Sequence, residues 1–170
     1  LQLHLQQPVI ASKGEAFILR TCSPVMTFGG GEIIETSDCL ANVKPSDLSA
    51  CLKTLHSGTP TEQVRGYLAA VGSNAIRVND LVQRLKTTRA ALGEILESGQ
   101  ALVTGGFAIA GGEMEKLCRL GTDRLEDFHR DEPDSAGLTL DVFRTILANH
   151  APGPIVEQAI QLLVESNNIQ

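Results

Sequence analysis

The chain has 170 residues, enough for one large or two to three small domains, and a formal net charge of −6 at pH 7. This acidic balance repels nucleic acid overall, so any RNA contact is expected to be local. Aromatic residues make up only 4% and tryptophan is absent, which argues against the stacking platforms of single-strand binders. No apolar run approaches membrane-spanning length and no signal-peptide pattern opens the chain, so no membrane partner is expected.

The cysteines do not form a metal-binding pattern. Cys22, Cys39, Cys51 and Cys118 are scattered without a CxxC pair, whereas metal ligands need closely spaced pairs that converge on one ion. The pattern favours reduced, mostly buried thiols in a cytosolic protein. We therefore predict a cytoplasmic location and no metal site.

The N-terminal part, residues 1–36, is predicted to be β structure. Leucine alternates with polar residues through residues 1–6, the period of a half-buried strand, and residues 16–21 form a second expected strand. Three consecutive glycines follow at 29–31, a density that supports a bulge or lets another backbone or a bulky ligand approach. Because a strand is already under way at Leu1 without an initial Met, we expect an excised fragment.

Residues 37–60 are predicted to be a connector, since Ser, Asp, Pro and Gly punctuate them. Within this segment, Pro45 and Asp47 favour the start of a short helix. From Thr61 onward the hydrophobic period changes to that of a helix.

Residues 61–111 contain the element order of a winged helix. The expected elements are a helix at 61–71, a short strand at 76–78, helices at 79–85 and 87–98, and a hairpin at 100–109. A plain helical bundle does not account for this succession.

Residues 112–170 are predicted to repeat this element order. A long helix is expected at 113–129, and the segment 137–139 mirrors the short strand of the first copy. Helices are expected at 140–147 and at 155–166, the last capped by the prolines around Gly153. A second wing would begin at Asn167, and this wing is truncated. The predicted fold class is mixed: β-barrel strands followed by two tandem winged-helix domains, mainly α with small β sheets.

Two motifs carry a family resemblance. Residues 14–20 and 27–31 resemble the paired "GdrFvlR" and "TiGGG" strands that end the third, β-barrel domain of elongation-factor-Tu-type GTPases. Residues 128–133, followed by 137–139, resemble the "FHraNPl…G" stretch in the second winged helix of the selenocysteine-specific elongation factor family, SelB. Here Asp131 and Glu132 are more acidic than the usual phrase.

The resemblance implies a function for the whole protein. A member of this family delivers selenocysteyl-tRNA, as a GTP complex, to the ribosome and recognises an mRNA hairpin through winged helices beyond Gln170. GTP and Mg would bind an upstream domain that makes the full-length protein a GTPase. No GxxxxGKS/T phosphate loop occurs in this chain, and we predict no catalytic residue, enzyme activity or cofactor for it.

Two groups of residues are candidates for RNA contact. By resemblance the barrel region faces the T-stem of tRNA, which implicates Arg20, Thr27, Gly29 and Gly30. The remaining candidates form the only local concentration of cations in the helical part: Arg77, Arg84, Lys86 and Arg89. Such a group is often only a solubilising helix face.

The third helix of each predicted winged-helix copy has a surface that disfavours binding to nucleic acid. The expected outward stripe is Arg89, Gly93 and Glu97 in the first copy. In the second copy it is Glu157, Gln161 and Glu165, which repels phosphate. We therefore expect weak or no RNA binding by the fragment alone and a role as spacer between the barrel and the RNA-reading end. The alternatives are a winged-helix DNA-binding transcriptional regulator and a protein-interaction adaptor.

Overall fold

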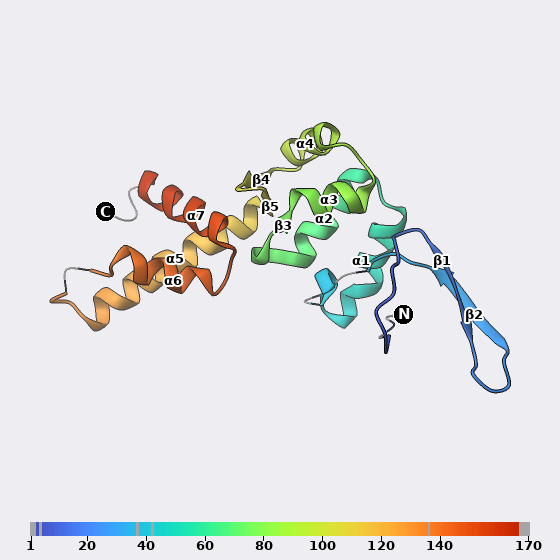
Figure 1. The fold of residues 1–170 in the computed structure, drawn as a ribbon. Coiled ribbons are helices and arrows are strands. Elements are labelled where there is room, and N and C mark those ends of the chain that lie inside the picture. The colour runs from blue at the N-terminus through green and yellow to red at the C-terminus, as the bar shows by residue number, and fades with distance from the viewer. Residues whose placement is uncertain (1–2, 4, 37, 42, 136, 167–170) are drawn as a thin grey trace.

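The computed structural model describes residues 3, 5–36, 38–41, 43–135 and 137–166. They form an elongated molecule (Figure 1). A two-stranded ribbon projects at one end, a first module of helices and a small sheet lies in the middle, and a second, helical module lies at the other end.

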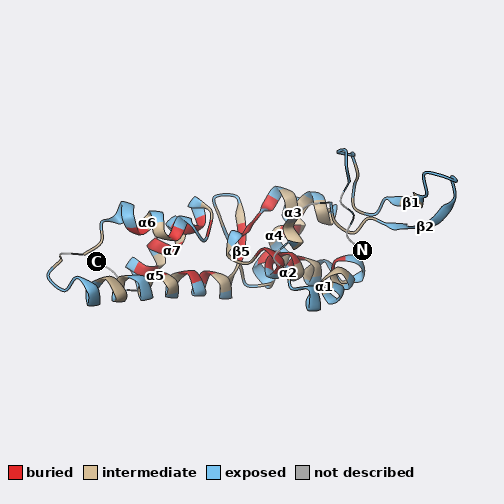
Figure 2. Ribbon diagram, turned by 90° about the horizontal axis from the view of Figure 1, so that it is seen from below, coloured by how far each residue is buried: buried red, intermediate tan, exposed pale blue. Residues whose placement is uncertain are grey.

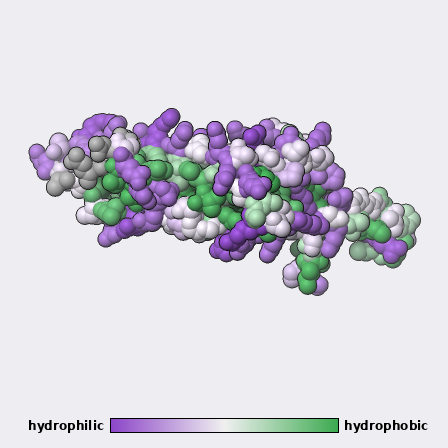
Figure 3. All heavy atoms as spheres, turned by 90° about the horizontal axis from the view of Figure 1, so that it is seen from above, coloured by the Kyte–Doolittle hydropathy of each residue, from purple (hydrophilic) through white to green (hydrophobic). Residues whose placement is uncertain are grey.

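The arm, residues 5–36, ends in this antiparallel ribbon. Its strands β1 (Ala16–Arg20) and β2 (Thr27–Glu32) pair with Ile18 opposite Gly30, and a register shift occurs at Leu19/Arg20. Large apolar side chains remain on its surface: Ile18 is 70% and Phe28 65% exposed. Figure 3 shows hydrophobic surface at the protruding end of the molecule. Two strands alone do not make a barrel, so the barrel assignment remains a prediction.

The strand expected at 1–6 is not present in its described part, because Leu3 and Leu5 lie outside any strand and are exposed. Alternation alone does not make a strand. A strand also needs a neighbour to accept and donate its backbone hydrogen bonds, and no described strand lies beside these residues.

The predicted connector is largely helical and belongs to the first module. A short 3-10 helix, η1 (Asp38–Leu40), precedes α1 (Pro45–Ser57), which packs along α2 (Pro60–Val71). Leu55 of α1 is fully buried in the first core. A capping box starts α2: the Thr59 hydroxyl accepts from the Glu62 backbone N–H, and the Glu62 carboxylate accepts from the Thr59 N–H at 2.7 Å.

The rest of the first module has the element order expected of a winged helix. The elements are η2 (Gly72–Asn74), β3 (Ile76–Arg77), α3 (Val78–Leu85), α4 (Arg89–Ser98), β4 (Ala101–Thr104) and β5 (Phe107–Ala110). The three strands form an antiparallel sheet in the order β3-β5-β4. Thr88 caps α4 by accepting from the Ala91 N–H, close to the start expected at residue 87. Helix α3 begins at Val78, one residue before the expected start at residue 79.

The second module consists of α5 (Gly111–Asp131), α6 (Leu140–Ala148) and α7 (Gly153–Glu165). The helices approach closely at Gly121 of α5, where an added Cβ would lie 3.0 Å from the Phe143 ring and 3.1 Å from Leu163. The strand expected at 137–139 is absent. In the first module β3 exists through its pairing with β5, and no described strand offers residues 137–139 such a partner. The wing expected from Asn167 lies outside the described residues.

The two modules share strand β5, and we call this contact the module joint. The consecutive residues Ala108 and Ile109 are both fully buried, but Ala108 belongs to the first core and Ile109 to the second. Beyond the strand, α5 begins at the next residue, without a linker. Figure 2 shows buried residues continuing from the first module through β5 into the second.

The tip of the wing also takes part in the module joint. Gly105, with φ +54°, lies against the start of α7, and a Cβ added there would collide with Pro154. Ala75, which precedes β3, is likewise part of the second core. Strand β5 and the tip of the hairpin are therefore packed between the two modules, whereas Leu102 and Val103 of β4 are exposed.

Candidate nucleic-acid interface

The four predicted residues of the arm lie together on the ribbon. Arg20 pairs with Thr27 across the strands, and its Nε donates a hydrogen bond to the Thr27 hydroxyl at 3.2 Å. Gly29 and Gly30 follow on β2. A Cβ on Gly30 would lie 2.6 Å from the carbonyl oxygen of Phe17. The backbone of the ribbon itself therefore requires glycine here, a reason different from the approach of a ligand.

The four predicted cations of the first module do not form one surface. Arg89, at the start of α4, donates to the side chain of Asn79 at 2.6 Å and is exposed. Arg77 is also exposed and lies over the ring of Phe107, 5.8 Å from its centre. Both remain accessible to solvent near the start of α3.

Arg84 is directed inward and is not available to a phosphate in this structure. Its Nη1 lies 2.7 Å from a carboxylate oxygen of Glu35 and donates to the Cys39 sulfur at 3.0 Å. The side chains of Arg84 and Glu35 are only 18% and 7% exposed. Burial by itself lowers the pKa of Arg84, but the charge of Glu35, together with the effects of Cys39 and Tyr67, outweighs burial and raises the pKa. Arg84 thus fastens the arm to the first module.

Tyr67 of α2 lies at the centre of the same contact, which we call the arm joint. Its ring is fully buried, with Arg84 5.4 Å and Lys13 5.7 Å from the ring centre. Lys13 also donates to the side chain of Gln63 at 2.9 Å. Burial and then the charge of Glu35 raise the pKa of Tyr67, so its hydroxyl stays protonated at neutral pH.

The sequence motifs did not point to Lys13, Glu35 or Tyr67 as members of one cluster. Their separation along the chain leaves no local pattern. The one available signal is Tyr67 itself, the single tyrosine of the chain, on the buried face of a predicted helix. A buried tyrosine usually has polar neighbours.

The outward-facing residues of α7, the third helix of the second copy, are less acidic in effect than expected. In α7, Glu157 accepts from Arg144 of α6 through Nε at 2.5 Å and through Nη2 at 3.3 Å. Gln161 donates to Glu165 at 2.9 Å. The expected acidic stripe is therefore partly neutralised by a neighbouring helix. Arg144 does not offer a free positive charge for contact with nucleic acid at this stripe, because it is already bound to two carboxylates, Glu157 and Asp141.

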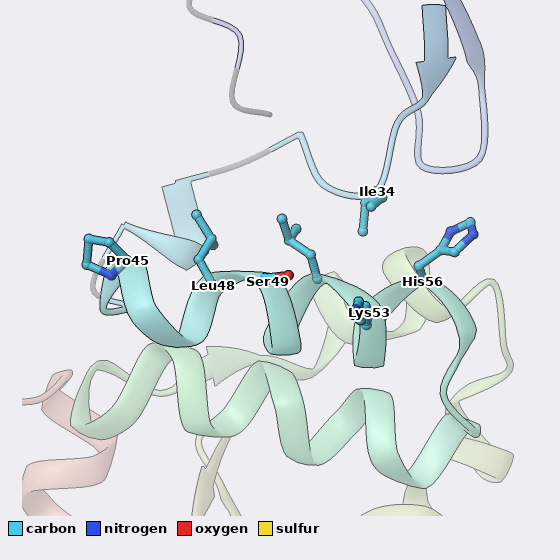
Figure 4. A pocket seen from close by; sticks show the side chains of 7 residues that line it. Ile34, Pro45, Leu48, Ser49, Lys53 and His56 are labelled. Carbon is cyan, nitrogen blue, oxygen red and sulfur yellow. The ribbon is translucent and has the colours of Figure 1, made fainter.

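An open groove of about 380 Å³ lies between α1 and the end of the arm. Figure 4 shows Leu48 of α1 pointing toward the side of the groove formed by the arm, where Ile34 lies, with His56 at one end; Ser49 and Lys53 also line the groove. His56 lies 3.8 Å from Glu32, and both side chains are about half exposed. Ser49 and Lys53 also line the groove, but no described hydrogen bond joins either of them to His56.

Two further features of the described residues concern metal binding and membrane-spanning helices. Among the described residues, no group of three or more His, Cys, Asp or Glu side chains is arranged to hold a metal ion. Within the same residues, no helix has the length and apolarity needed to cross a membrane. His129, at the end of α5, contacts the ring of Phe128 with 6.0 Å between the ring centres.

Comparison with protein families places the second module. Residues 122–170 match the family model of the winged helix of elongation factor SelB. The second module is thus similar to a SelB winged helix, in agreement with the resemblance of residues 128–133. The match covers less than half of the chain, and a comparison of the chain with curated proteins found no match.

Proposed function

We propose that this chain is part of a SelB-like elongation factor and acts as a rigid spacer. It connects a tRNA-holding β-barrel, of which the arm is the last part, to an mRNA-hairpin-binding end. The factor delivers selenocysteyl-tRNA to the ribosome in the cytoplasm, with GTP and Mg bound by an upstream domain. The chain itself contributes no catalytic group. The family match of residues 122–170 supports this assignment.

The module joint is the observation that carries the spacer role. A spacer transmits distance and angle only when its parts do not hinge. Ile109 is fully buried in the core of the module that follows its own, and Gly105 is packed against Pro154. Hinging between the modules would expose Ile109 to water, and full exposure of such a side chain costs about 1.5–3 kcal/mol.

The same joint weighs against a winged-helix DNA-binding regulator. That class uses its wing and third helix on the duplex. Here β5 is buried between two cores, and Glu157 of α7 is bound by Arg144. The adaptor alternative is supported by one feature, the exposed apolar side chains of the ribbon such as Ile18 and Phe28.

An insertion in a full-length factor that contains this chain tests the spacer role. Six Gly and Ser residues inserted between Ala110 and Gly111 uncouple the modules. The control is the same insertion between Pro133 and Asp134, in an exposed turn. We expect the junction insertion to reduce selenocysteine incorporation at a UGA codon strongly, without loss of GTP hydrolysis or tRNA binding. Equal incorporation by both variants would refute a rigid spacer.

A further inference from the structure

Two lysines from distant segments meet where the arm joins the first module. Lys86 follows α3 in the left-handed conformation, with φ +50°, and is exposed. Its ammonium nitrogen lies 3.5 Å from the position that a Cβ on Gly14 would occupy. Gly14 directly follows Lys13 in the turn that precedes β1. The fold therefore brings Lys86 beside Lys13, and with Arg84 this makes three cations in one place.

Three carboxylates lie near these lysines. Glu35 is paired with Arg84, whereas Glu32 lies 3.8 Å from His56 Nδ1, beyond hydrogen-bond distance, and its Oε1 is 3.8 Å from the same Cβ position on Gly14 that Lys86 approaches. Glu15 accepts a hydrogen bond from the backbone N–H of Ser12 at 3.1 Å. Neither Lys13 nor Lys86 has a carboxylate within ion-pair distance in the described part of the chain.

The pKa of Lys13 reflects charges of both signs. Burial lowers this pKa most, the charges of Glu35 and Glu32 raise it, and the charges of Lys86 and Arg84 lower it. Like charges held together without full neutralisation gain free energy when an anion binds between them. The hydrogen bond to Gln63 and the ring of Tyr67 hold the Lys13 ammonium in place.

We propose that Lys13 and Lys86 form a contact for phosphate groups of an RNA backbone. The contact lies at the junction of the arm and the first module, and the assignment of RNA as the ligand rests on the proposed function. Lysine ammoniums are point charges that suit backbone phosphates, which position a nucleic acid without reading its sequence. Lys86 is exposed, as contact with an extended ligand requires. Binding of backbone phosphates does not need a helix that recognises the bases.

This assignment changes the predicted cation set. Arg84 leaves it because Glu35 holds it, and Lys13, which no sequence pattern singled out, enters it. A spacer with such a contact would follow the RNA backbone beside the barrel tail. The affinity of two phosphate contacts alone is low, consistent with the weak binding expected of this chain.

Salt-dependent binding of a fluorescein-labelled RNA hairpin to the 170-residue chain tests the proposal. The test variant is Lys13→Gln/Lys86→Gln. The control, Lys53→Gln/Lys116→Gln, removes the same charge from two lysines that are both exposed, whereas Lys13 of the test pair is half-buried. Loss of one lysine–phosphate contact reduces the slope of log K against log salt by about 1, so the test variant should lose about 2. The control should keep the slope of the parent chain, and Lys13→Arg/Lys86→Arg should restore it.

Three results would overturn the proposal. The first is a test variant with the same slope as its control. The second is a parent chain that does not bind the hairpin below about 10⁻⁴ M at low salt. The third is tighter binding to vesicles of anionic phospholipid than to RNA. The second result would leave the spacer role intact, because the insertion at Ala110 tests that role without depending on these lysines. Unchanged melting temperatures in all variants show that the fold is retained.

Discussion

The arm joint is held by a largely buried ion pair, whereas the module joint is held by an apolar strand. In the arm joint, Glu35 and Arg84 meet at 2.7 Å beside the ring of Tyr67. In the module joint, Ile109 enters the core of the following module and Gly105 abuts Pro154. An ion pair contributes little net stability but fixes geometry, while apolar burial supplies most of the free energy of folding. This difference suggests that the ion pair fixes the orientation of the arm relative to the first module. The shared apolar strand instead joins the two modules into one packed unit.

Truncation of Ile109 should give the largest effect. Ile109→Ala removes a fully buried side chain, and such changes reduce the free energy of unfolding by about 2–5 kcal/mol. Because Ile109 packs in the second core, amide hydrogen exchange should accelerate more in α5–α7 than in α3 and α4. Leu92→Ala in the first core is the matched control, with the opposite distribution expected. Identical exchange patterns would show that the strand does not separate two cores.

Removal of Glu35 should affect the arm more than the modules. Glu35→Ala leaves the mostly buried Arg84 without its carboxylate, and loss of one partner from a buried pair costs about 3 kcal/mol. The double variant Glu35→Leu/Arg84→Met should recover much of this, because no uncompensated charge remains. Thermal unfolding measures the cost, and hydrogen exchange of residues 15–35 locates it. A double variant no better than Glu35→Ala would contradict an electrostatic arm joint.

A methyl group at the wing tip tests the module joint with less disruption. Both Gly105 and Gly106 have positive φ, +54° and +79°, so Ala strains the backbone at either position. Only at Gly105 does the added Cβ collide with another residue, Pro154. We expect Gly105→Ala to be less stable than Gly106→Ala by about 1–3 kcal/mol, the usual cost of overpacking. Equal melting temperatures would show that the wing tip can move away from α7.

Local patterns predicted most of the elements correctly, apart from the strands expected at 1–6 and 137–139, and the joints depended on contacts that such patterns do not contain. The hairpin at Gly105-Gly106, the cap before α4 and the start of α7 at Pro152-Gly153-Pro154 follow from turn, capping and first-turn residues, which act within a few positions. The arm joint unites Lys13 with Arg84 across the chain, beyond the reach of any local pattern. One signal for the module joint was overlooked. Phe107–Ala110 is apolar without alternation, which is typical of a strand buried on both faces.

The smallest effect is expected at the capping box that starts α2, which lies in neither joint. Thr59→Ala removes the acceptor for the Glu62 N–H, and loss of such a cap costs about 1 kcal/mol. Hydrogen bonds from the backbone and then the side chain of Thr59 lower the pKa of Glu62. A carboxylate whose pKa is lower in the folded state stabilises the fold above its ordinary pKa, and this contribution is lost as pH falls through the folded value.

The difference in stability between the parent chain and Thr59→Ala should therefore narrow below about pH 5. Urea unfolding of both proteins between neutral and acidic pH measures this difference. Glu62→Gln keeps a hydrogen-bond acceptor at the same position and removes the titration, so its stability should depend less on pH in that range. Because the cap lies outside both joints, exchange in α5–α7 should not change selectively. Selective loosening of the second module would mean that the first module transmits local strain through β5.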